Sequence, residues 1–339
     1  MRIKLPFATR AVLATCAAAL LGACRREAQP AANTAWQAMG TIASLSIPAP
    51  SAADLPASRA TVESRWNELE DSLSIFRESS DISRVNAAAG DGSPVEVGAD
   101  ARRALAASLE IAEASGGAFD PTVGPLMHAW GFRGGDAPTE PPSPETLASA
   151  RALVGWTNVV ATGSTARLAL AGMRLDLGGS AKGFAVDEAY DALRASGATD
   201  FLVNLGGNIR ACGTPAPDRD GWRIGVRDPI NQGWTLGTIT LRDGEAVATS
   251  GDYERFVTIG GVRYSHIMDS RTGWPATGVA GVTVRAPSAC LADCLSTALF
   301  VLGPDAGRVL LARYPGCEAL WVLSEFPFER ISTESFGLE

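Results

Sequence analysis

Two groups of residues, far apart in the chain, have the side-chain types of a site for phosphate and a cation. The first is residues 176–183, which read Asp-Leu-Gly-Gly-Ser-Ala-Lys-Gly. The second combines residues 249–255 and 266–273 with Asp293 and Thr297. Glycines and small side chains let the backbone approach a ligand closely, and a few fixed charges can hold phosphates beside a cation. We therefore treat the two groups as halves of one predicted site.

Residues 176–183 are expected to pass from the end of a strand through a tight turn into the first turn of a helix. Backbone N–H groups and the positive end of the helix dipole would then face an anion. Lys182 adds a mobile positive charge. The segment has neither the Walker A pattern nor the Rossmann glycine fingerprint. Gly-Gly before a helix is also common as a simple turn, so this segment alone leaves a purely structural role open.

Asp293 and Thr297 are spaced four residues apart at the start of a predicted helix. This spacing places a carboxylate and a hydroxyl on one helix face. Two hard oxygen ligands, joined by backbone carbonyls and phosphate oxygens, suit Mg²⁺. Taken alone, the same pair also fits a helix-capping aspartate followed by an ordinary helical threonine.

The N-terminus has the organisation of a bacterial lipoprotein signal peptide. Basic residues precede an apolar stretch, residues 11–21, that is too short to span a membrane. The stretch ends in Leu-Gly-Ala-Cys, where Cys24 would be lipidated; in an ordinary cleaved signal this cysteine would be incidental. We predict a signal peptide over residues 1–23 and a flexible tether over residues 24–34.

Composition argues against two classes of function. The formal net charge is −8, and removal of the signal peptide with its three basic residues takes it to −11, with no basic stripe that would suit nucleic acid. No C-x-x-C is present and the two histidines lie far apart, which disfavours a thiolate–imidazole zinc site. Cys290 and Cys294 are expected to be buried thiols, because a disulfide within one helical turn is strained.

The order of the expected elements favours an α+β fold in one domain, residues 35–330. Strands that follow one another directly, with helices grouped between them, argue against a doubly wound sheet. Helices are predicted over residues 57–73, 100–116, 144–153, 180–196 and 289–302. Strands are predicted over residues 201–204, 222–227, 238–241, 256–259, 262–267, 279–286 and 319–323. Gly260-Gly261 predicts a hairpin between two of these strands.

Several further motifs appear together with the two charged groups and in a fixed order. They are Met-Gly-Thr at 39–41, Phe-Arg at 76–77 with Ser-Arg-Val-Asn at 83–86, residues 117–126, Asn-Leu-Gly-Gly-Asn at 204–208 and Trp-Arg-Ile-Gly at 222–225. Together the motifs resemble the ApbE family of flavin transferases over about residues 39–303. The resemblance implies a two-lobed, T-fold-like α+β architecture with largely antiparallel sheets and helices packed on them.

The resemblance also implies roles for individual residues. Positions that match FAD contacts in the family are Met39, Phe76, Ala118, Phe119, Asp120, Asp176, Lys182 and Ile267. Asp293 and Thr297, with the carbonyls of Gly179 and Ser296, match the family's Mg²⁺ site. Ser270 stands where the family usually has proline, which would loosen the turn near His266. His128 and Trp130 match no fixed site position and are interpreted as structural.

The activity that the resemblance implies is transfer of FMN from FAD to a threonine of an acceptor protein, with AMP as the leaving group. Mg²⁺ and Lys182 would neutralise charge on the pyrophosphate, and Phe76 would pack against the flavin ring. The proton acceptor is expected to be His266, Asp269 or Asp252.

The expected location follows from the N-terminal signal, and the expected partner from the resemblance. The expected location is the periplasm, on a lipid anchor at Cys24 with the inner membrane favoured, and the expected acceptor is a subunit of a membrane redox complex. Two alternatives remain open, an FAD pyrophosphatase that uses water in place of threonine and a flavin-binding lipoprotein without catalysis.

Overall fold

The computed structural model describes residues 31–134, 138–231 and 233–339. The predicted signal peptide, Cys24 and most of the predicted tether lie outside these residues. β1 begins at Ala32, so the last three residues of the predicted tether belong to the folded domain. The domain also extends beyond residue 330, because Phe336 is buried and the backbone of Glu339 pairs with that of Thr238.

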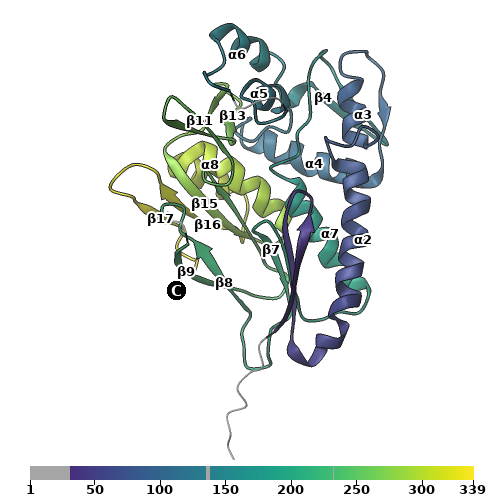
Figure 1. Ribbon diagram of the computed structural model, residues 1–339, viewed down its shortest axis with the longest axis vertical. Coiled ribbons are helices and arrows are strands. Elements are labelled where there is room, and N and C mark those ends of the chain that lie inside the picture. The colour runs from purple at the N-terminus through teal and green to yellow at the C-terminus, as the bar shows by residue number, and fades with distance from the viewer. Residues whose placement is uncertain (1–30, 135–137, 232) are drawn as a thin grey trace, which may run out of the picture.

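An eight-stranded antiparallel sheet runs through the molecule in the order β1-β2-β6-β7-β10-β15-β16-β17 (Figure 1). Its strands are β1 (Ala32–Ala38), β2 (Thr41–Ile47), β6 (Phe201–Leu205), β7 (Asn208–Cys212), β10 (Ala246–Gly251), β15 (Val279–Ala286), β16 (Glu318–Leu323) and β17 (Arg330–Ser332). Gly206 and Gly207, both with positive φ, form the two-residue turn of the β6–β7 hairpin. The predicted α+β class is confirmed.

The two faces of this sheet are covered by different elements. Side chains from β2, β6, β10 and β15 pack in one large core with the helices α2 (Leu55–Leu73), α7 (Ala181–Ala195) and α8 (Ala289–Leu311). On the opposite face, Ala211, Val247 and Leu320 pack with the hairpin of β8 (Trp222–Arg227) and β9 (Thr235–Leu241). The alternation of side chains along a strand accounts for this division, since neighbouring residues point to opposite faces.

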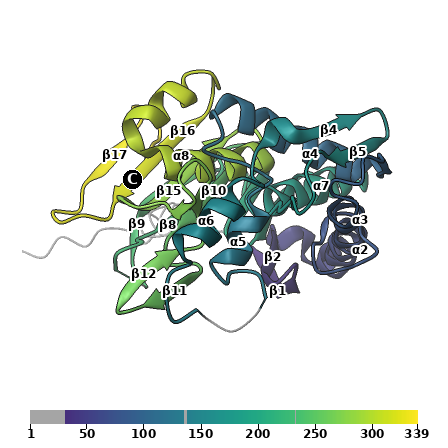
Figure 2. The ribbon, with the colours of Figure 1, turned by 90° about the horizontal axis from the view of Figure 1, so that it is seen from above.

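Smaller elements form a second group in the upper part of the view in Figure 1, and Figure 2 shows them from above. They are α3 (Asp81–Ala87), β3 (Val95–Glu96), α4 (Ala99–Ala114), α5 (Gly124–Ala129), α6 (Pro144–Arg151), β4 (Val159–Thr162), β5 (Thr165–Leu168), β11 (Phe256–Ile259), β12 (Val262–Ser265), β13 (Met268–Asp269) and β14 (Trp274–Pro275). α5 and α6 pack on the β11–β12 hairpin through a third apolar cluster that contains Trp130 and Met268. This packing holds the chain around His266.

The helix α8 is long and apolar enough to span a membrane by length and hydropathy. Half of that apolar window is buried inside the fold, where α8 packs against β10 and β15. Gly303 has non-helical backbone angles and is followed by Pro304, so two helical segments meet there. The predicted helix over residues 289–302 therefore corresponds to the first segment, which carries Asp293 and Thr297.

Candidate functional site

Asp293 lies at the point where the N-terminal turns of α7 and α8 touch. Its side chain is 5% exposed, and Oδ2 accepts a hydrogen bond of 2.9 Å from the backbone N–H of Gly183 in α7. A Cβ on Gly183 would lie 2.2 Å from the Ala289 carbonyl oxygen, so only glycine permits this approach of the two helices. The structure therefore brings residues 176–183 into contact with Asp293, as the sequence predicted.

Two further polar side chains contact the same carboxylate. Lys182 Nζ lies 3.5 Å from Asp293 Oδ1. The Asn208 amide, oriented to satisfy both neighbours, donates to Asp293 Oδ1 at 3.1 Å and accepts from Lys182 Nζ at 3.2 Å. Asn208 lies at the start of β7, after the Gly206-Gly207 turn, and sequence analysis gave it no role in the site. Its place in the Asn-Leu-Gly-Gly-Asn motif at residues 204–208 was the sequence feature that could have indicated a role in the site.

The other predicted metal ligands lie beside Asp293. Thr297 is one turn further along α8, and Ser296 donates its hydroxyl hydrogen to the Asp293 carbonyl at 2.9 Å. A Cβ on Gly179 would lie 3.1 Å from Thr297 Oγ1 and 3.0 Å from the Phe119 ring, which places this glycine backbone against the threonine. The structure thus brings together Gly179, Asp293, Ser296 and Thr297.

The donor chemistry of this group fits Mg²⁺. It offers one buried carboxylate, one hydroxyl and backbone carbonyls, which are hard oxygen donors that leave positions for phosphate and water. Within residues 31–134, 138–231 and 233–339, no cluster of three or more His, Cys, Asp and Glu side chains is placed to hold a metal ion.

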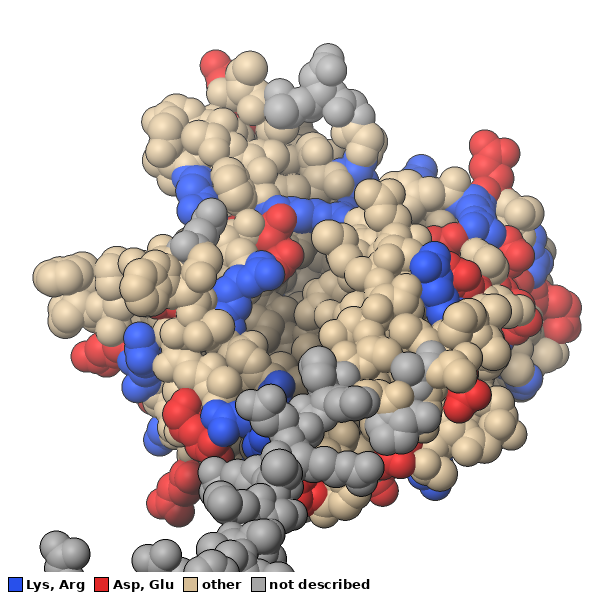
Figure 3. Space-filling view, turned by 60° about the horizontal axis from the view of Figure 1, so that its bottom comes forward, with Lys and Arg blue, Asp and Glu red and all other residues tan. Residues whose placement is uncertain are grey.

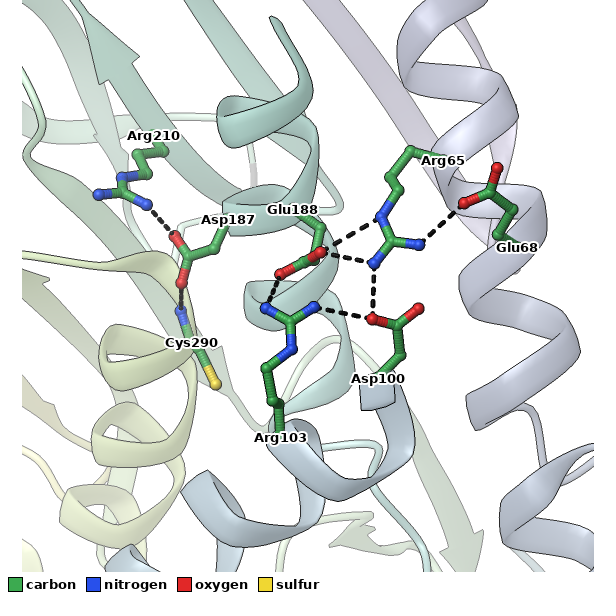
Figure 4. A network of polar contacts seen from close by, with 8 residues as sticks. All are labelled: Arg65, Glu68, Asp100, Arg103, Asp187, Glu188, Arg210 and Cys290. Atoms are coloured by element: carbon green, nitrogen blue, oxygen red, sulfur yellow. Dashed lines mark hydrogen bonds and ion pairs between the residues drawn. The ribbon is translucent and has the colours of Figure 1, made fainter. Parts of the chain in front are cut away.

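Two consecutive acidic residues of α7 hold this helix in place (Figure 4). Asp187 accepts hydrogen bonds from the backbone N–H groups of Ala289 and Cys290 at the start of α8 and pairs with Arg210 at 2.9 Å. Burial raises the pKa of Asp187, and the positive charge of Arg210 opposes that effect. Asp187 therefore fixes the start of α8 on α7, one turn before Asp293.

Glu188 anchors the other side of α7. It pairs with Arg65 of α2 at 2.6 Å and with Arg103 of α4 at 2.7 Å, and Asp100 bridges the same two arginines (Figure 4). The network ties α7, which carries Lys182, to two further helices. This network of charges fixes the position of α7 without contacting the residues that would bind a ligand.

Asp176 is held by an arginine that sequence analysis missed. Arg133 Nε and Nη2 donate to the two carboxylate oxygens of Asp176 at 2.7 Å and 3.1 Å, and both side chains are largely buried. The backbone N–H of Gly178 donates to the same carboxylate at 2.9 Å. Arg133 follows α5 and lies 43 residues before Asp176, so no local spacing links the two.

Phe76 and Met39, two predicted flavin contacts, each have an unusual local structure. Phe76 is 78% exposed, and the guanidinium carbon of Arg133 lies 6.0 Å from its ring centroid. Exposure of a whole aromatic ring beside a charged pair is unusual and suits stacking with a planar ligand. Met39 has φ +47° and, in the described chain, is the one residue other than glycine with positive φ. Strain of this kind is frequent at ligand sites.

The predicted contact residues Ala118, Phe119 and Asp120 form a buried loop. Both oxygens of Asp120 are occupied by protein donors, since Oδ1 accepts from Thr122 and Oδ2 from the Trp156 backbone N–H. Burial raises the pKa of Asp120, and these hydrogen bonds oppose the effect. These hydrogen bonds hold the loop, and the contact of Asp120 with FAD stays a prediction.

Ser270 supports this loop from the other half of the site. Its hydroxyl donates to the Gly117 carbonyl and so joins the turn after β13 to residues 117–120. A proline could not make this bond. The expectation that Ser270 loosens the turn is therefore wrong in this chain, because the hydroxyl supplies a tertiary contact there.

The imidazole of His266 is held neutral. Burial lowers its pKa from 6.5 to about 4, and the positive charges of Arg255, Lys182 and Arg133 act in the same direction. Nδ1 lies 3.0 Å from the Arg255 carbonyl oxygen, which can only accept, so Nδ1 carries the hydrogen and Nε2 keeps its lone pair. The His266 ring lies 6.4 Å from the ring of Phe132, which is next to Arg133, the residue that binds Asp176.

The other two candidate bases, Asp269 and Asp252, differ in how they are held. Both oxygens of Asp269 accept from Arg271 at 2.8 Å, and Oδ1 also accepts from the Arg271 backbone N–H at 3.0 Å. This pairing stabilises the turn between β13 and β14, and it leaves Asp269 poorly placed to accept a substrate proton. Burial raises the pKa of Asp252, with Arg263 at 4.0 Å opposing the effect.

The remaining predicted residues have structural contacts. The backbone N–H of Ile267 donates to the Ser265 hydroxyl, and its carbonyl accepts from Ala276, while its side chain is buried. Trp130 is buried and donates from Nε1 to the Gly273 carbonyl at 3.0 Å, as its structural interpretation requires. His128 is exposed, with Nδ1 3.0 Å from the Arg133 carbonyl oxygen.

Together these groups can hold an aromatic ligand with a negatively charged chain. Lys182, the helix N-termini and a cation bound at Asp293 suit phosphates, Phe76 suits a planar ring system, and His266 offers an unprotonated nitrogen. On the face shown in Figure 3, basic and acidic side chains lie close to one another, and the surface is hollowed near its centre.

Comparison with known proteins agrees with this geometry. The sequence profile of the ApbE family matches residues 39–321. The FAD:protein FMN transferase of Treponema pallidum is 38% identical over 295 residues, which are 83% of this chain and 80% of that protein. The FAD:protein FMN transferase of Vibrio cholerae is 31% identical and covers 94% of this chain and 95% of its own length.

Solved structures give the same result for the fold. The Vibrio cholerae flavin transferase ApbE superposes with a TM-score of 0.80 at 31% identity, covering 91% of this chain and 99% of its own. The ApbE protein of Thermotoga maritima superposes with a TM-score of 0.81 at 33% identity, covering 90% and 98%. Because the profile, the relatives and the superposed structures all cover most of the sequence, this chain belongs to the ApbE family.

Proposed function

We propose that this protein is an FAD:protein FMN transferase, which moves FMN from FAD onto an acceptor protein. The observation that carries the proposal is the cluster of Lys182, Asp293 and Thr297 at the starts of α7 and α8. Arg133 binds Asp176 and lies 6.0 Å from the exposed ring of Phe76. The ring of Phe132, next to Arg133, lies 6.4 Å from the imidazole of His266. The Treponema pallidum and Vibrio cholerae relatives carry this activity in their names.

The acceptor group in this proposal is a threonine hydroxyl. Its oxygen attacks the phosphorus on the FMN side of FAD, and the bond from that phosphorus to the bridging oxygen breaks, so that AMP leaves with the bridging oxygen. The hydroxyl proton passes to His266 Nε2, which is free because Nδ1 is held by the Arg255 carbonyl. The products are an FMN–threonine phosphoester and AMP.

The remaining residues bind and orient. Lys182 places a positive charge against the pyrophosphate, and Phe76 provides a surface for the flavin ring. Asp293 and Thr297, with the Gly179 and Ser296 carbonyls, would hold Mg²⁺. When bound, this ion supplies a Lewis acid that neutralises charge on the phosphate oxygens.

The test is incubation of the full-length protein with FAD, Mg²⁺ and a candidate periplasmic acceptor, followed by mass measurement. We expect the acceptor to gain one FMN through a phosphoester, with AMP formed in equal amount. The matched control is the same acceptor with its threonine changed to alanine, which should remain unlabelled. Release of free FMN and AMP at the same rate with and without acceptor would show that the protein is an FAD pyrophosphatase and not a transferase. FAD left intact for hours would favour a carrier.

We also propose a lipid anchor at Cys24 that places the enzyme at the periplasmic side of a membrane, with the inner membrane favoured. The Leu-Gly-Ala-Cys sequence after a short apolar stretch supports this. A membrane location suits an acceptor that is a subunit of a membrane redox complex.

Changing the lipidated residue tests the anchor. We expect Cys24→Ser to release the protein into the soluble periplasmic fraction with FAD binding unchanged, since residue 24 precedes the folded domain. Fractionation and immunoblotting measure the distribution. Sedimentation of the variant with membranes in high salt would contradict the proposal.

A further inference from the structure

Three hydroxyl groups meet between β10 and α8, next to the proposed metal ligands. Ser250 Oγ, on β10, lies 2.8 Å from Ser296 Oγ and 3.3 Å from Thr297 Oγ1, both on α8. Ser296 Oγ lies 2.9 Å from the carbonyl oxygen of Asp293. Ser250 has no role in the proposed binding or chemistry, although it touches one proposed ligand directly.

The directions of these hydrogen bonds follow from the number of hydrogens available. A carbonyl oxygen can only accept, so the single hydroxyl hydrogen of Ser296 points to the Asp293 carbonyl. Ser296 must then accept from Ser250, whose own hydrogen is used in that contact. Ser250 can therefore only accept from Thr297. The order is Thr297 to Ser250 to Ser296 to the Asp293 carbonyl.

This order determines which side of the Thr297 oxygen remains available. Its hydrogen points toward β10, so its lone pairs are directed away from Ser250. A Cβ on Gly179 would lie 3.1 Å from the same oxygen, so the backbone that supplies another proposed ligand is adjacent. A hydroxyl binds a cation through its lone pairs, and a hydrogen pointing at the cation would repel it.

We propose that Ser250 is a positioning residue for the metal site, which turns the Thr297 hydroxyl so that its oxygen can bind Mg²⁺. The inference rests on the proposed function, because it assumes the cation site at Asp293 and Thr297. Mg²⁺ requires nearly ideal octahedral geometry at short distances, so the orientation of each ligand matters. Partners that orient metal ligands commonly change metal affinity about 10-fold to 100-fold when they are removed.

The neighbouring residue provides a matched control. Thr249 precedes Ser250 on β10 and pairs through Oγ1 with Thr283 Oγ1 on β15 at 3.0 Å. Alternation along the strand directs its side chain to the face opposite α8. Thr249→Val therefore removes a hydroxyl from the same strand and leaves the three-hydroxyl chain intact.

The experiment measures cation affinity directly. Mn²⁺ replaces Mg²⁺ as a paramagnetic probe, and electron paramagnetic resonance follows its binding to the full-length protein with FAD present. We expect Ser250→Ala to raise the Mn²⁺ dissociation constant about 10-fold, by the range for orienting partners, and Thr249→Val to leave it unchanged. High Mg²⁺ should restore most of the transfer rate of Ser250→Ala, since Ser250 does not touch the substrate.

The outcomes separate this inference from the proposed function. Equal dissociation constants for Ser250→Ala and the parent, with equal thermal stability, would overturn the role of Ser250. Mn²⁺ binding that does not depend on Asp293 would overturn it as well. If binding depends on Asp293 and Ser250 but no acceptor is labelled, the inference stands and the transferase proposal fails.

Discussion

Asp293→Asn is expected to reduce kcat/KM for FMN transfer about a thousand-fold or more. A bound cation supplies several kcal/mol of stabilisation to charge in the transition state, and each 1.36 kcal/mol corresponds to a factor of ten. Asp293 is the single carboxylate in the proposed ligand set and is nearly inaccessible to solvent. Asparagine keeps the shape and can still accept from the Gly183 N–H, so the fold should survive while the charge is lost. Labelling rates at increasing Mg²⁺ measure the effect.

Asp187→Asn is the matched control for this prediction. Asp187 lies on α7 and is also a largely buried carboxylate that contacts the start of α8. It accepts hydrogen bonds from backbone N–H groups of α8, pairs with Arg210 and lies outside the proposed ligand set. We expect its loss to lower the unfolding temperature and to leave the Mg²⁺ dependence nearly unchanged. If a folded Asp293→Asn variant keeps turnover within about ten-fold of the parent, Asp293 is not a metal ligand and serves only to join α7 and α8 through its bond to Gly183.

The proximity of the proposed metal ligands was partly predictable because these residues lie at two helix starts. Lys182 and Gly183 open α7, and Asp293 and Thr297 occupy one face of α8, so helical spacing already places them. The contact between α7 and α8 could not be predicted from the spacing of residues in the sequence. It depends on a Gly183 without Cβ and on Asp187 holding the start of α8.

Contacts between distant segments account for what sequence analysis missed. Arg133 meets Asp176 and Asn208 meets Asp293 only in the folded chain, and neither pair has a characteristic spacing. Similarly, the sequence did not reveal that the oxygens of Asp120 and Asp269 accept hydrogen bonds from Thr122, Trp156 and Arg271; both stay predicted site residues. A sequence gives the type of a side chain and does not show which of its oxygens remain free.

Two of the missed strands, β1 and β10, share a physical cause. β10 consists of small residues, and β1 alternates without a strongly buried face, so neither has the run of large β-branched and aromatic residues that marks a strand. Their positions in the sheet depend on pairing with neighbours, β10 with β7 and β15, and β1 with β2. By contrast, Gly260-Gly261 marked the β11–β12 hairpin correctly, because both residues have positive φ.

His266→Ala is expected to lower kcat for transfer by about 10²-fold to 10⁴-fold, the usual contribution of a positioned proton acceptor. FAD affinity should change far less, because a proton acceptor acts mainly in the transition state. Flavin fluorescence measures binding, and acceptor labelling measures transfer. The chain has one other histidine, His128, and His128→Ala is the control that should leave both quantities close to those of the parent.

The pH dependence gives the same residue a second test. Because burial lowers the pKa of His266 to about 4, its nitrogen stays unprotonated through pH 5, and the acid limb of kcat attributable to it should lie near pH 4, well below 6.5. The free energy of unfolding should depend on pH for the same reason. Between pH 6.5 and 4 the unfolded chain binds a proton at this histidine that the folded chain does not, so the protein becomes less stable as the pH is lowered through that range. Urea unfolding of His266→Ala should show a smaller loss there than the parent. An acid limb at pH 6.5 would contradict the lowered pKa of His266. A loss of FAD affinity equal to the loss of kcat in His266→Ala would show that this residue binds the substrate and does not accept its proton.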